Sequence, residues 1–171
     1  MTEKPLVNLI QEEQLEGEAK EIFQAMKEKS GQVPKWMKVM ANNPDILTGF
    51  FSMFKATMDN APLDKKLKWK VAFLVSELNK CEFCVSVSKM QLKSFGLENM
   101  ETVEAEDKKE ELAFEYARAV NDHAYKIEPE LIEKVKKEFN DAELVELTCV
   151  VGLFNYINRF NDALGVLPDL Q

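Results

Sequence analysis

The chain of 171 residues is poor in the residues that interrupt regular structure, with only six glycines and six prolines. This scarcity excludes a low-complexity or collagen-like protein. No apolar run reaches the roughly 18 residues of a membrane-spanning helix. The opening residues, MTEKPLVNLIQEEQ, also lack the basic-then-apolar pattern of a signal peptide. We therefore expect a cytoplasmic protein that has no membrane segment.

Basic residues are also in short supply, because 22 lysines and arginines face 30 aspartates and glutamates, for a net charge of −8. A protein that binds nucleic-acid backbone needs a basic face, and a polybasic membrane-surface protein needs a cluster of cations. The charge balance argues against both classes. The length corresponds to one domain, at about 150 residues per domain.

Every periodic pattern in the sequence is helical, with apolar residues three or four positions apart. We therefore expect an all-α protein with a single domain of about seven to nine helices. Between Leu147 and Ile157 the last helix is apolar nearly all round, which is typical of a central buried helix. The patterns predict helices over residues 9–29, 35–41, 45–59, 64–78, 79–95, 108–123, 129–139 and 144–164, with 98–106 as a short helix or a loop.

Two pairs of residues are spaced like capping boxes, Asn79 with Glu82 and Asn140 with Glu143. The second pair precedes the last helix. The first pair predicts that a new helix begins at Asn79. One unbroken helix over residues 64–95 is the alternative.

The one chemical signal in the sequence is the motif Cys81-Glu82-Phe83-Cys84. Two cysteines three residues apart share a helix face, with Cα atoms about 5 Å apart, which is within the reach of a disulfide. A helix that begins at Asn79 places Cys81 in its first turn, where the helix dipole and Lys80 favour a thiolate. Cys84, one turn deeper, should be less exposed. The pattern is the minimal dithiol redox unit.

Other interpretations of this pair stay open. The total of three cysteines excludes the disulfide framework of a small secreted protein. A structural zinc site needs four ligands, and the only other cysteine and histidine are Cys149 and His123. Cys149 lies in the apolar last helix, where a small buried side chain is the simpler interpretation, and His123 is typical of a solvated surface. The pair could also have no chemistry at all. We expect no metal and no cofactor.

Two parts of the sequence, one around the cysteines and one at the end of the chain, carry a family resemblance. The first part reads VSELNKCEFCVSVS over residues 75–88. The second part consists of two stretches, DAELVEL over 141–147 and FNYINRFNDALGV over 154–166. In this order they resemble the alkylhydroperoxidase D-like, or carboxymuconolactone decarboxylase, family. The resemblance covers roughly residues 35–168, with residues 1–34 as an N-terminal helical extension.

This resemblance implies an all-helical fold and a homo-oligomer, commonly a trimer or a hexamer built from trimers. It also implies that Cys81 and Cys84 form a dithiol that reduces a peroxide substrate. A lipoyl or thioredoxin-like partner would then reduce the disulfide again. The resemblance favours Cys84 as the attacking sulfur, whereas the helix-terminus argument favours Cys81, so the order of attack stays open.

The sequence departs from the family pattern at both positions of its proton relay. Ser88 stands where the redox branch has a histidine, and Trp69 stands where it has a glutamate. A serine hydroxyl can hydrogen-bond a thiolate but cannot take its proton near neutral pH. Glu77 is a candidate substitute base, although its spacing from Lys66 and Lys70 favours a solvated charge.

The sequence therefore supports two hypotheses. In the first, the chain is a thiol–disulfide oxidoreductase that reduces peroxides weakly, since losing general-base help typically costs about 10²–10⁴-fold in rate. In the second, the chain has lost catalysis and serves as an oligomeric binding or scaffold protein. A decarboxylase of lactone acids follows only from the family's other name, and the retained cysteine pair counts against it.

Overall fold

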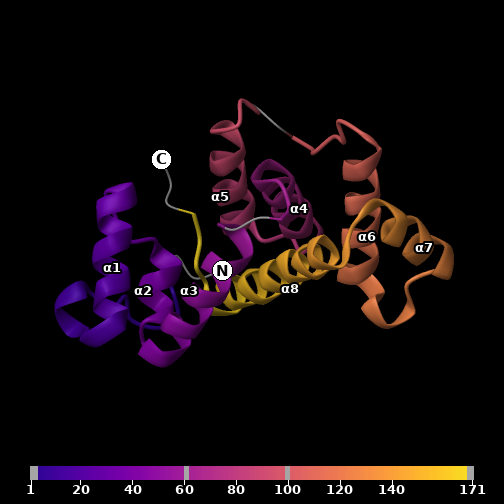
Figure 1. Ribbon diagram of the computed structural model, residues 1–171. Coiled ribbons are helices and arrows are strands. Elements are labelled where there is room, and N and C mark those ends of the chain that lie inside the picture. The colour runs from indigo at the N-terminus through magenta and orange to yellow at the C-terminus, as the bar shows by residue number, and fades with distance from the viewer. Residues whose placement is uncertain (1–3, 60–61, 99–100, 169–171) are drawn as a thin grey trace. The chain divides into compact units, whose positions relative to one another are not determined.

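The computed structural model describes residues 4–59, 62–98 and 101–168, and every regular element within them is a helix (Figure 1). The all-α class and the number of α-helices expected from the sequence are therefore confirmed. The elements are η1 (Glu12–Gln14), α1 (Gly17–Ser30), α2 (Lys35–Met40), α3 (Pro44–Met58), α4 (Lys65–Leu78), α5 (Glu82–Lys93), α6 (Lys108–His123), η2 (Ala124–Lys126), α7 (Pro129–Glu138) and α8 (Asp141–Leu164).

The helix predicted over residues 9–29 differs most from the structure. Its first part forms the short helix η1, and α1 begins only at Gly17. Gly17 has a φ of 58°, a left-handed conformation through which an α-helix does not continue. Residues 99–100 of the segment predicted as a short helix or loop lie outside the described residues, and the described part of that segment is a loop.

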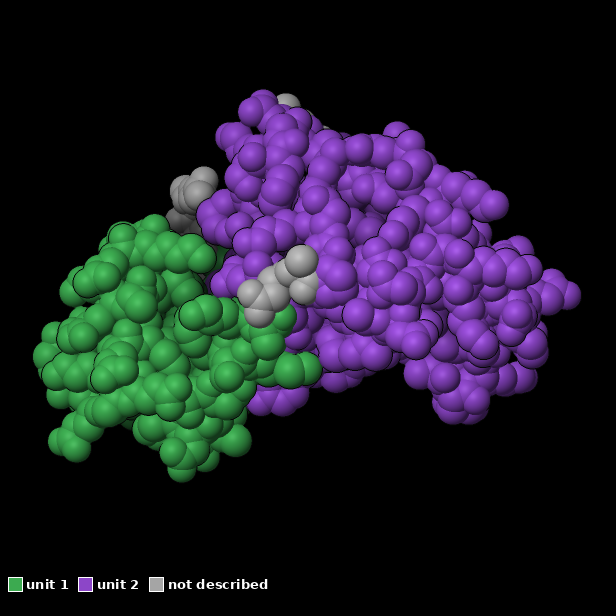
Figure 2. Space-filling view, viewed as in Figure 1, with its two compact units in different colours: residues 1–56, 160–171 green, residues 57–159 purple. Residues whose placement is uncertain are grey.

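The contacts divide the chain into two compact units (Figure 2). Unit 1 comprises Met1–Ala56 and Phe160–Gln171, and unit 2 comprises Thr57–Arg159. A hydrogen bond joins the two segments of unit 1, because the N–H of Leu6 donates to the carbonyl of Leu164 at 2.9 Å. The larger buried apolar side chains of unit 1 include Ile22, Phe23, Met37, Met40 and Leu47.

Unit 2 contains all three cysteines and is organised around α4. This helix packs against α5 and α6, and α6 packs against α7. Asp64 begins α4 by accepting the N–H of Leu67 at 3.1 Å, as expected of an N-cap residue. Every residue from Leu67 to Ser76 is buried, so α4 is the central helix of this unit.

One buried lysine of α4 forms an ion pair with α8. Lys68, with 0% exposure, donates from Nζ to Glu146 at 2.7 Å and to the carbonyl of Thr57 at 3.0 Å. The other carboxylate oxygen of Glu146 accepts the N–H of Leu63 at 2.7 Å. A buried ion pair is tolerated only when such additional hydrogen bonds satisfy the charges.

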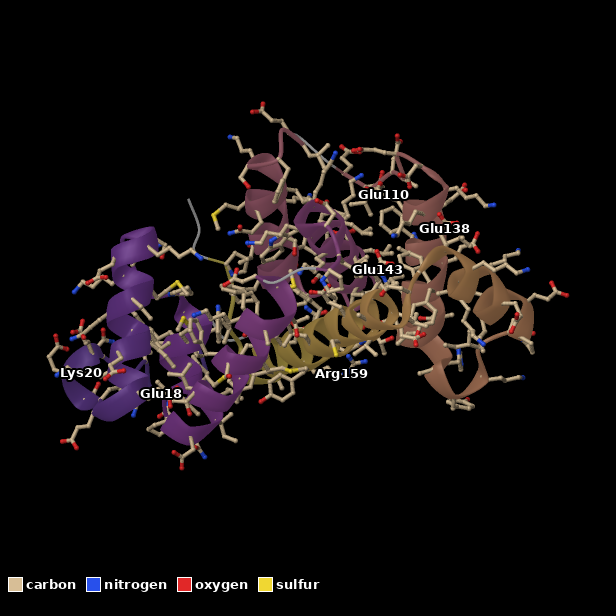
Figure 3. The ribbon with its side chains drawn as sticks, viewed as in Figure 1. Glu18, Lys20, Glu110, Glu138, Glu143 and Arg159 are labelled. Carbon is tan, nitrogen blue, oxygen red and sulfur yellow. The ribbon has the colours of Figure 1, made fainter. Side chains whose placement is uncertain are left out.

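A second buried lysine connects α4 to the segment before α6. Lys70 donates from Nζ to Glu110 at 2.6 Å and to Glu106 at 3.0 Å, and Lys66 also contacts Glu106. Glu110 lies on α6 (Figure 3). The expectation that Lys70 shares a solvated face with Glu77 is therefore wrong, because Lys70 is only 1% exposed.

These contacts change the pKa values of the charged groups. Burial opposes the charged form of Lys70, but its hydrogen bonds to Glu110 and Glu106 outweigh burial and raise the pKa of Lys70. Hydrogen bonds from Lys66 and then Lys70 lower the pKa of Glu106. Both shifts favour the ionised forms, so the cluster stays charged around neutral pH.

The start of α8 contains the expected capping box. The N–H of Asn140 donates to Glu143 at 2.9 Å, and the N–H of Glu143 donates back to Asn140 Oδ1 at 3.0 Å. Lys109 donates to Glu143 at 2.7 Å, and this bond, together with the N–H of Asn140, lowers the pKa of Glu143. Figure 3 shows Glu143 and Arg159 in different parts of α8.

The expectation that α8 is buried all round is wrong. Val145 is 64% exposed, Thr148 and Gly152 are exposed, and Tyr156 is 47% exposed. These four residues lie three or four positions apart and form one stripe, the α8 stripe. Cys149 beside it is half-buried rather than buried. Apolar residues occur on both faces of α8, so their pattern could not show which face is covered.

Within the described residues, no helix is both long and apolar enough to cross a bilayer.

Candidate active site

The α4–α5 turn, residues 79–81, separates two helices. The N–H of Lys80 donates to the carbonyl of Glu77 at 3.1 Å, and the N–H of Cys81 donates to the carbonyl of Ser76 at 3.0 Å. This pair of bonds is the Schellman arrangement that ends many helices. Lys80 has a φ of 59°, in the left-handed region that favours glycine. The alternative of one unbroken helix over residues 64–95 is therefore wrong.

The predicted start of the second helix is also wrong, by about one turn. Asn79 ends α4 instead of capping α5, and Cys81 is the N-cap. The side chain of Asn79 does not reach Glu82 because it donates to Asn155 at 3.1 Å and to Asn158 at 2.9 Å. The pattern of residues 79–82 indicated a boundary but not which residue lies at it.

The two cysteines both lie at the N-terminus of α5. Cys81 is the N-cap, and Cys84 is the third residue of the helix proper. The carbonyl of Cys81 accepts the N–H of Val85 at 3.0 Å, so its backbone begins the helix. Cys81 has 0% exposure and Cys84 has 4%, so the expectation that Cys84 is the less exposed is wrong. The N-terminus of α5 favours a thiolate at these positions, whereas burial opposes it.

Amide side chains of α8 support the end of α4. Asn158, with 0% exposure, accepts from Asn79 and donates to Ser76 Oγ at 3.1 Å. The hydroxyl of Ser76 donates in turn to the carbonyl of Ala72 at 2.7 Å. Asn158 thus contacts Asn79, the first residue of the α4–α5 turn, and Ser76, whose carbonyl accepts the N–H of Cys81. Sequence analysis did not single out Asn158 for this role, and its only signal was a polar residue among apolar neighbours on α8.

Ser88 lies one turn after Cys84 on α5 and is fully buried. Its hydroxyl has no hydrogen-bond partner among the described residues. Native proteins leave few buried polar groups unsatisfied, so each such group requires an explanation. The position at which the resemblance led us to expect a histidine is thus occupied by a buried hydroxyl.

Trp69 occupies the second relay position and is 9% exposed. Its ring packs edge-on against Phe154 of α8, with centroids 5.9 Å apart and planes at 76°. This geometry is the usual one for aromatic packing in a core. Trp69 therefore has a structural role that requires no chemistry.

The structure also places the remaining candidates, Glu77 and His123. Glu77 is exposed on α4, as expected of a solvated charge. His123 ends α6, and its ring meets that of Tyr125 edge-on at 6.0 Å. Among the described residues, no three histidine, cysteine, aspartate or glutamate side chains gather in a way that could hold a metal.

Comparisons with known proteins test the resemblance seen in the sequence. No family model matches the chain. The uncharacterized protein YnjA of Escherichia coli (strain K12) is 27% identical over 125 residues, which are 67% of this chain and 69% of YnjA.

Solved structures match much more of the chain. An uncharacterized peroxidase-related protein from Silicibacter sp. TM1040 has a TM-score of 0.84 and 24% identity, over 98% of this chain and 93% of its own. The alkylhydroperoxidase AhpD core of a peroxidase-related protein from Ralstonia eutropha JMP134 has a TM-score of 0.84 and 16% identity, over 96% and 92%. The chain has the alkylhydroperoxidase D-like fold. The matches span both compact units.

The same fold also occurs in the debrominase Bmp8. A cysteine-to-alanine variant of Bmp8 in complex with 2,3,4-tribromopyrrole has a TM-score of 0.80 and 18% identity, over 96% of this chain and 92% of its own. The alkylhydroperoxidase D-like fold thus occurs in proteins named for different reactions. The fold expected from the sequence is confirmed.

Proposed function

We propose that the chain is a thiol–disulfide oxidoreductase of the alkylhydroperoxidase D-like family that reduces peroxides. The observation that carries this proposal is the position of Cys81 and Cys84 in one helical turn at the N-terminus of α5. The fold of the peroxidase-related neighbours supports it. The buried Ser88 and the packed Trp69 replace the relay, so turnover is expected to be weak.

The proposed reaction has two steps. One thiolate attacks the peroxide O–O bond, which gives a sulfenic acid and, with one proton, an alcohol or water. The second thiol then displaces the hydroxyl from that sulfur, releasing water and forming the Cys81–Cys84 disulfide. A lipoyl or thioredoxin-like dithiol would return two electrons and two protons to complete the cycle.

The test uses the Cys149→Ser variant, which leaves only the pair. We expect peroxide to oxidise it with the loss of two hydrogens by mass spectrometry. We also expect the pair to titrate below the ordinary cysteine pKa of about 8.5. The control variant, Cys81→Ser with Cys84→Ser, retains Cys149 and should neither form the intramolecular disulfide nor consume peroxide at the same rate.

A lapsed, non-enzymatic role is the second candidate, and the loss of both relay side chains favours it. It predicts an unshifted thiol pKa and no disulfide under mild peroxide. That result would contradict the oxidoreductase proposal and support a binding or scaffold role.

Reductive debromination is a third use of the same dithiol, and the likeness to Bmp8 supports it. Two thiols and an aryl bromide would give the disulfide, the aryl hydride, bromide and a proton. The same variant, incubated with 2,3,4-tribromopyrrole, should release bromide only if this reaction is available. Bromide release without peroxide consumption would replace the peroxidase proposal.

We propose further that the chain forms a homo-oligomer, a trimer or a hexamer. The α8 stripe supports this proposal, because it places Val145 and Tyr156 in solvent beside an exposed Gly152 that allows close approach. Val145→Glu should lower the mass measured by light scattering, whereas Glu138→Lys on the exposed face of α7 should not. A monomeric wild type would refute the proposal.

A further inference from the structure

Ser88 is a buried group that no structural contact accounts for. Within the described residues it carries the only buried hydroxyl without a hydrogen-bond partner. Leaving a hydroxyl in this state costs folding free energy, since water would satisfy it in the unfolded chain. A stabilising role in the reduced, uncharged protein therefore does not explain a serine at this position.

The hydroxyl also does not use the partner that serines commonly find in helices. Two serines of α4 and α5 and the C-cap serine of α5 donate back along the chain: Ser76 to Ala72 at 2.7 Å, Ser86 to Phe83 at 2.7 Å and Ser94 to Gln91 at 2.6 Å. The equivalent acceptor for Ser88 is the carbonyl of Cys84, four residues earlier. Ser88 makes no such bond, so the helix backbone does not satisfy its hydroxyl.

The position of Ser88 relative to Cys84 identifies an acceptor that is not a backbone atom. Residues four apart share a helix face, and helical side chains lean toward the N-terminus, so the side chain of Ser88 lies over the turn that holds Cys84. A neutral thiol is a weak acceptor, whereas an anionic sulfur accepts strong, charge-assisted hydrogen bonds. Ionisation of Cys84 would therefore create the missing partner.

We propose that the Ser88 hydroxyl donates a hydrogen bond to the sulfur of Cys84 when that sulfur is a thiolate. The inference rests on the proposed function, because only a redox-active Cys84 needs its thiolate stabilised. Ser88 keeps its proton throughout and acts as a positioned donor rather than as a base.

The first test measures the acidity of each cysteine separately. Cys81→Ser with Cys149→Ser leaves Cys84 alone, and adding Ser88→Ala should raise the pKa of Cys84 by about one unit, a tenfold change in ionisation. Cys84→Ser with Cys149→Ser leaves Cys81, two turns from Ser88, and there Ser88→Ala should change nothing. Ser88→Thr keeps the hydroxyl and should restore the acidity of Cys84.

The second test compares the stability of the protein with the reactivity of Cys84. A structural role for Ser88 and a role as hydrogen-bond donor to Cys84 predict different changes in these two quantities. Ser88→Ala removes a buried, unpartnered hydroxyl, so the urea midpoint should rise or stay the same. Alkylation of Cys84 by iodoacetamide should become about tenfold slower. The matched control on the same helix, Ser86→Ala, loses a formed hydrogen bond and should leave alkylation unchanged. A lower midpoint with unchanged alkylation and an unchanged Cys84 pKa in Ser88→Ala would overturn the proposal.

The outcomes separate this inference from the proposed function. If the wild-type pair oxidises with peroxide but Ser88→Ala leaves the pKa of Cys84 unchanged, the role of Ser88 is refuted and the oxidoreductase stands. If the pKa depends on Ser88 but no disulfide forms, the hydrogen bond stands and the oxidoreductase is refuted.

Discussion

The two ends of α4 bury polar side chains in different ways. The first half buries Lys68 and Lys70, and each has carboxylate partners within 3.0 Å. The α4–α5 turn and the first two turns of α5 bury neutral groups instead, and one of them, the hydroxyl of Ser88, has no partner among the described residues. Lys68 and Lys70 are fully paired, as buried charges with a structural role must be. The unpartnered hydroxyl of Ser88 requires a different explanation, and the proposed bond to a Cys84 thiolate supplies one.

The largest expected effect comes from breaking the buried ion pair of Lys68 and Glu146. Lys68→Met leaves Glu146 buried without its counter-ion and should destabilise the protein by about 3–5 kcal/mol in urea unfolding. Adding Glu146→Leu removes the orphaned charge and should recover most of that loss. A single variant as stable as wild type would show that the pairing is not structural.

Asn158→Ala tests the support of the α4–α5 turn. It removes the partner of both Asn79 and Ser76, so we expect a loss of about 1–3 kcal/mol in the free energy of unfolding. In a double-mutant cycle with Asn79→Ala, the two changes should be less than additive because they break one shared bond. Strict additivity of the two losses in stability would mean that the bond between Asn79 and Asn158 does not stabilise the turn.

The strain at Lys80 should be measurable separately from its charge. Lys80→Gly adopts the left-handed conformation without a Cβ clash and should stabilise the protein by about 1 kcal/mol. Lys80→Ala removes the same charge but keeps the Cβ, so it should give no such gain. Equal stability of the glycine and alanine variants would refute the strain argument.

The smallest expected effect is a pH dependence at Glu106. Its pKa is lower in the folded state, so its contribution is present above the ordinary value of about 4.3 and is lost as pH falls through the lowered value. Urea midpoints measured from neutral pH downward should fall less steeply for Glu106→Gln than for wild type. Glu138→Gln, at an exposed site on α7, is the control and should follow wild type.

Sequence patterns predicted the helices well where a cap lies close to the first apolar residue. The Asn140–Glu143 box and the Asp64 cap are both present as expected. The similar Asn79–Glu82 spacing predicted the wrong start because α8 provides acceptors for Asn79, and the sequence around residue 79 contains no information about α8. Tertiary contacts outweighed a local preference at that point.

The candidate site was predicted only in part. Cys81, Cys84, Ser88 and Trp69 could be named from the sequence, but their burial could not. Cys81 was expected in the first turn of α5, whereas it is the N-cap of that helix and is fully buried. The unpartnered state of Ser88 required the coordinates, because serine is usually satisfied inside a helix by its own backbone.

Cys81 is hydrogen-bonded to the helices on both sides of it, since its N–H donates to the carbonyl of Ser76 of α4 and its carbonyl accepts the N–H of Val85 of α5. A disulfide to Cys84 would close a ring of four residues that lies wholly within one coil of backbone. Such a ring tethers no distant segments of the chain to each other. Forming or breaking such a disulfide would therefore leave the contacts between the helices as they are.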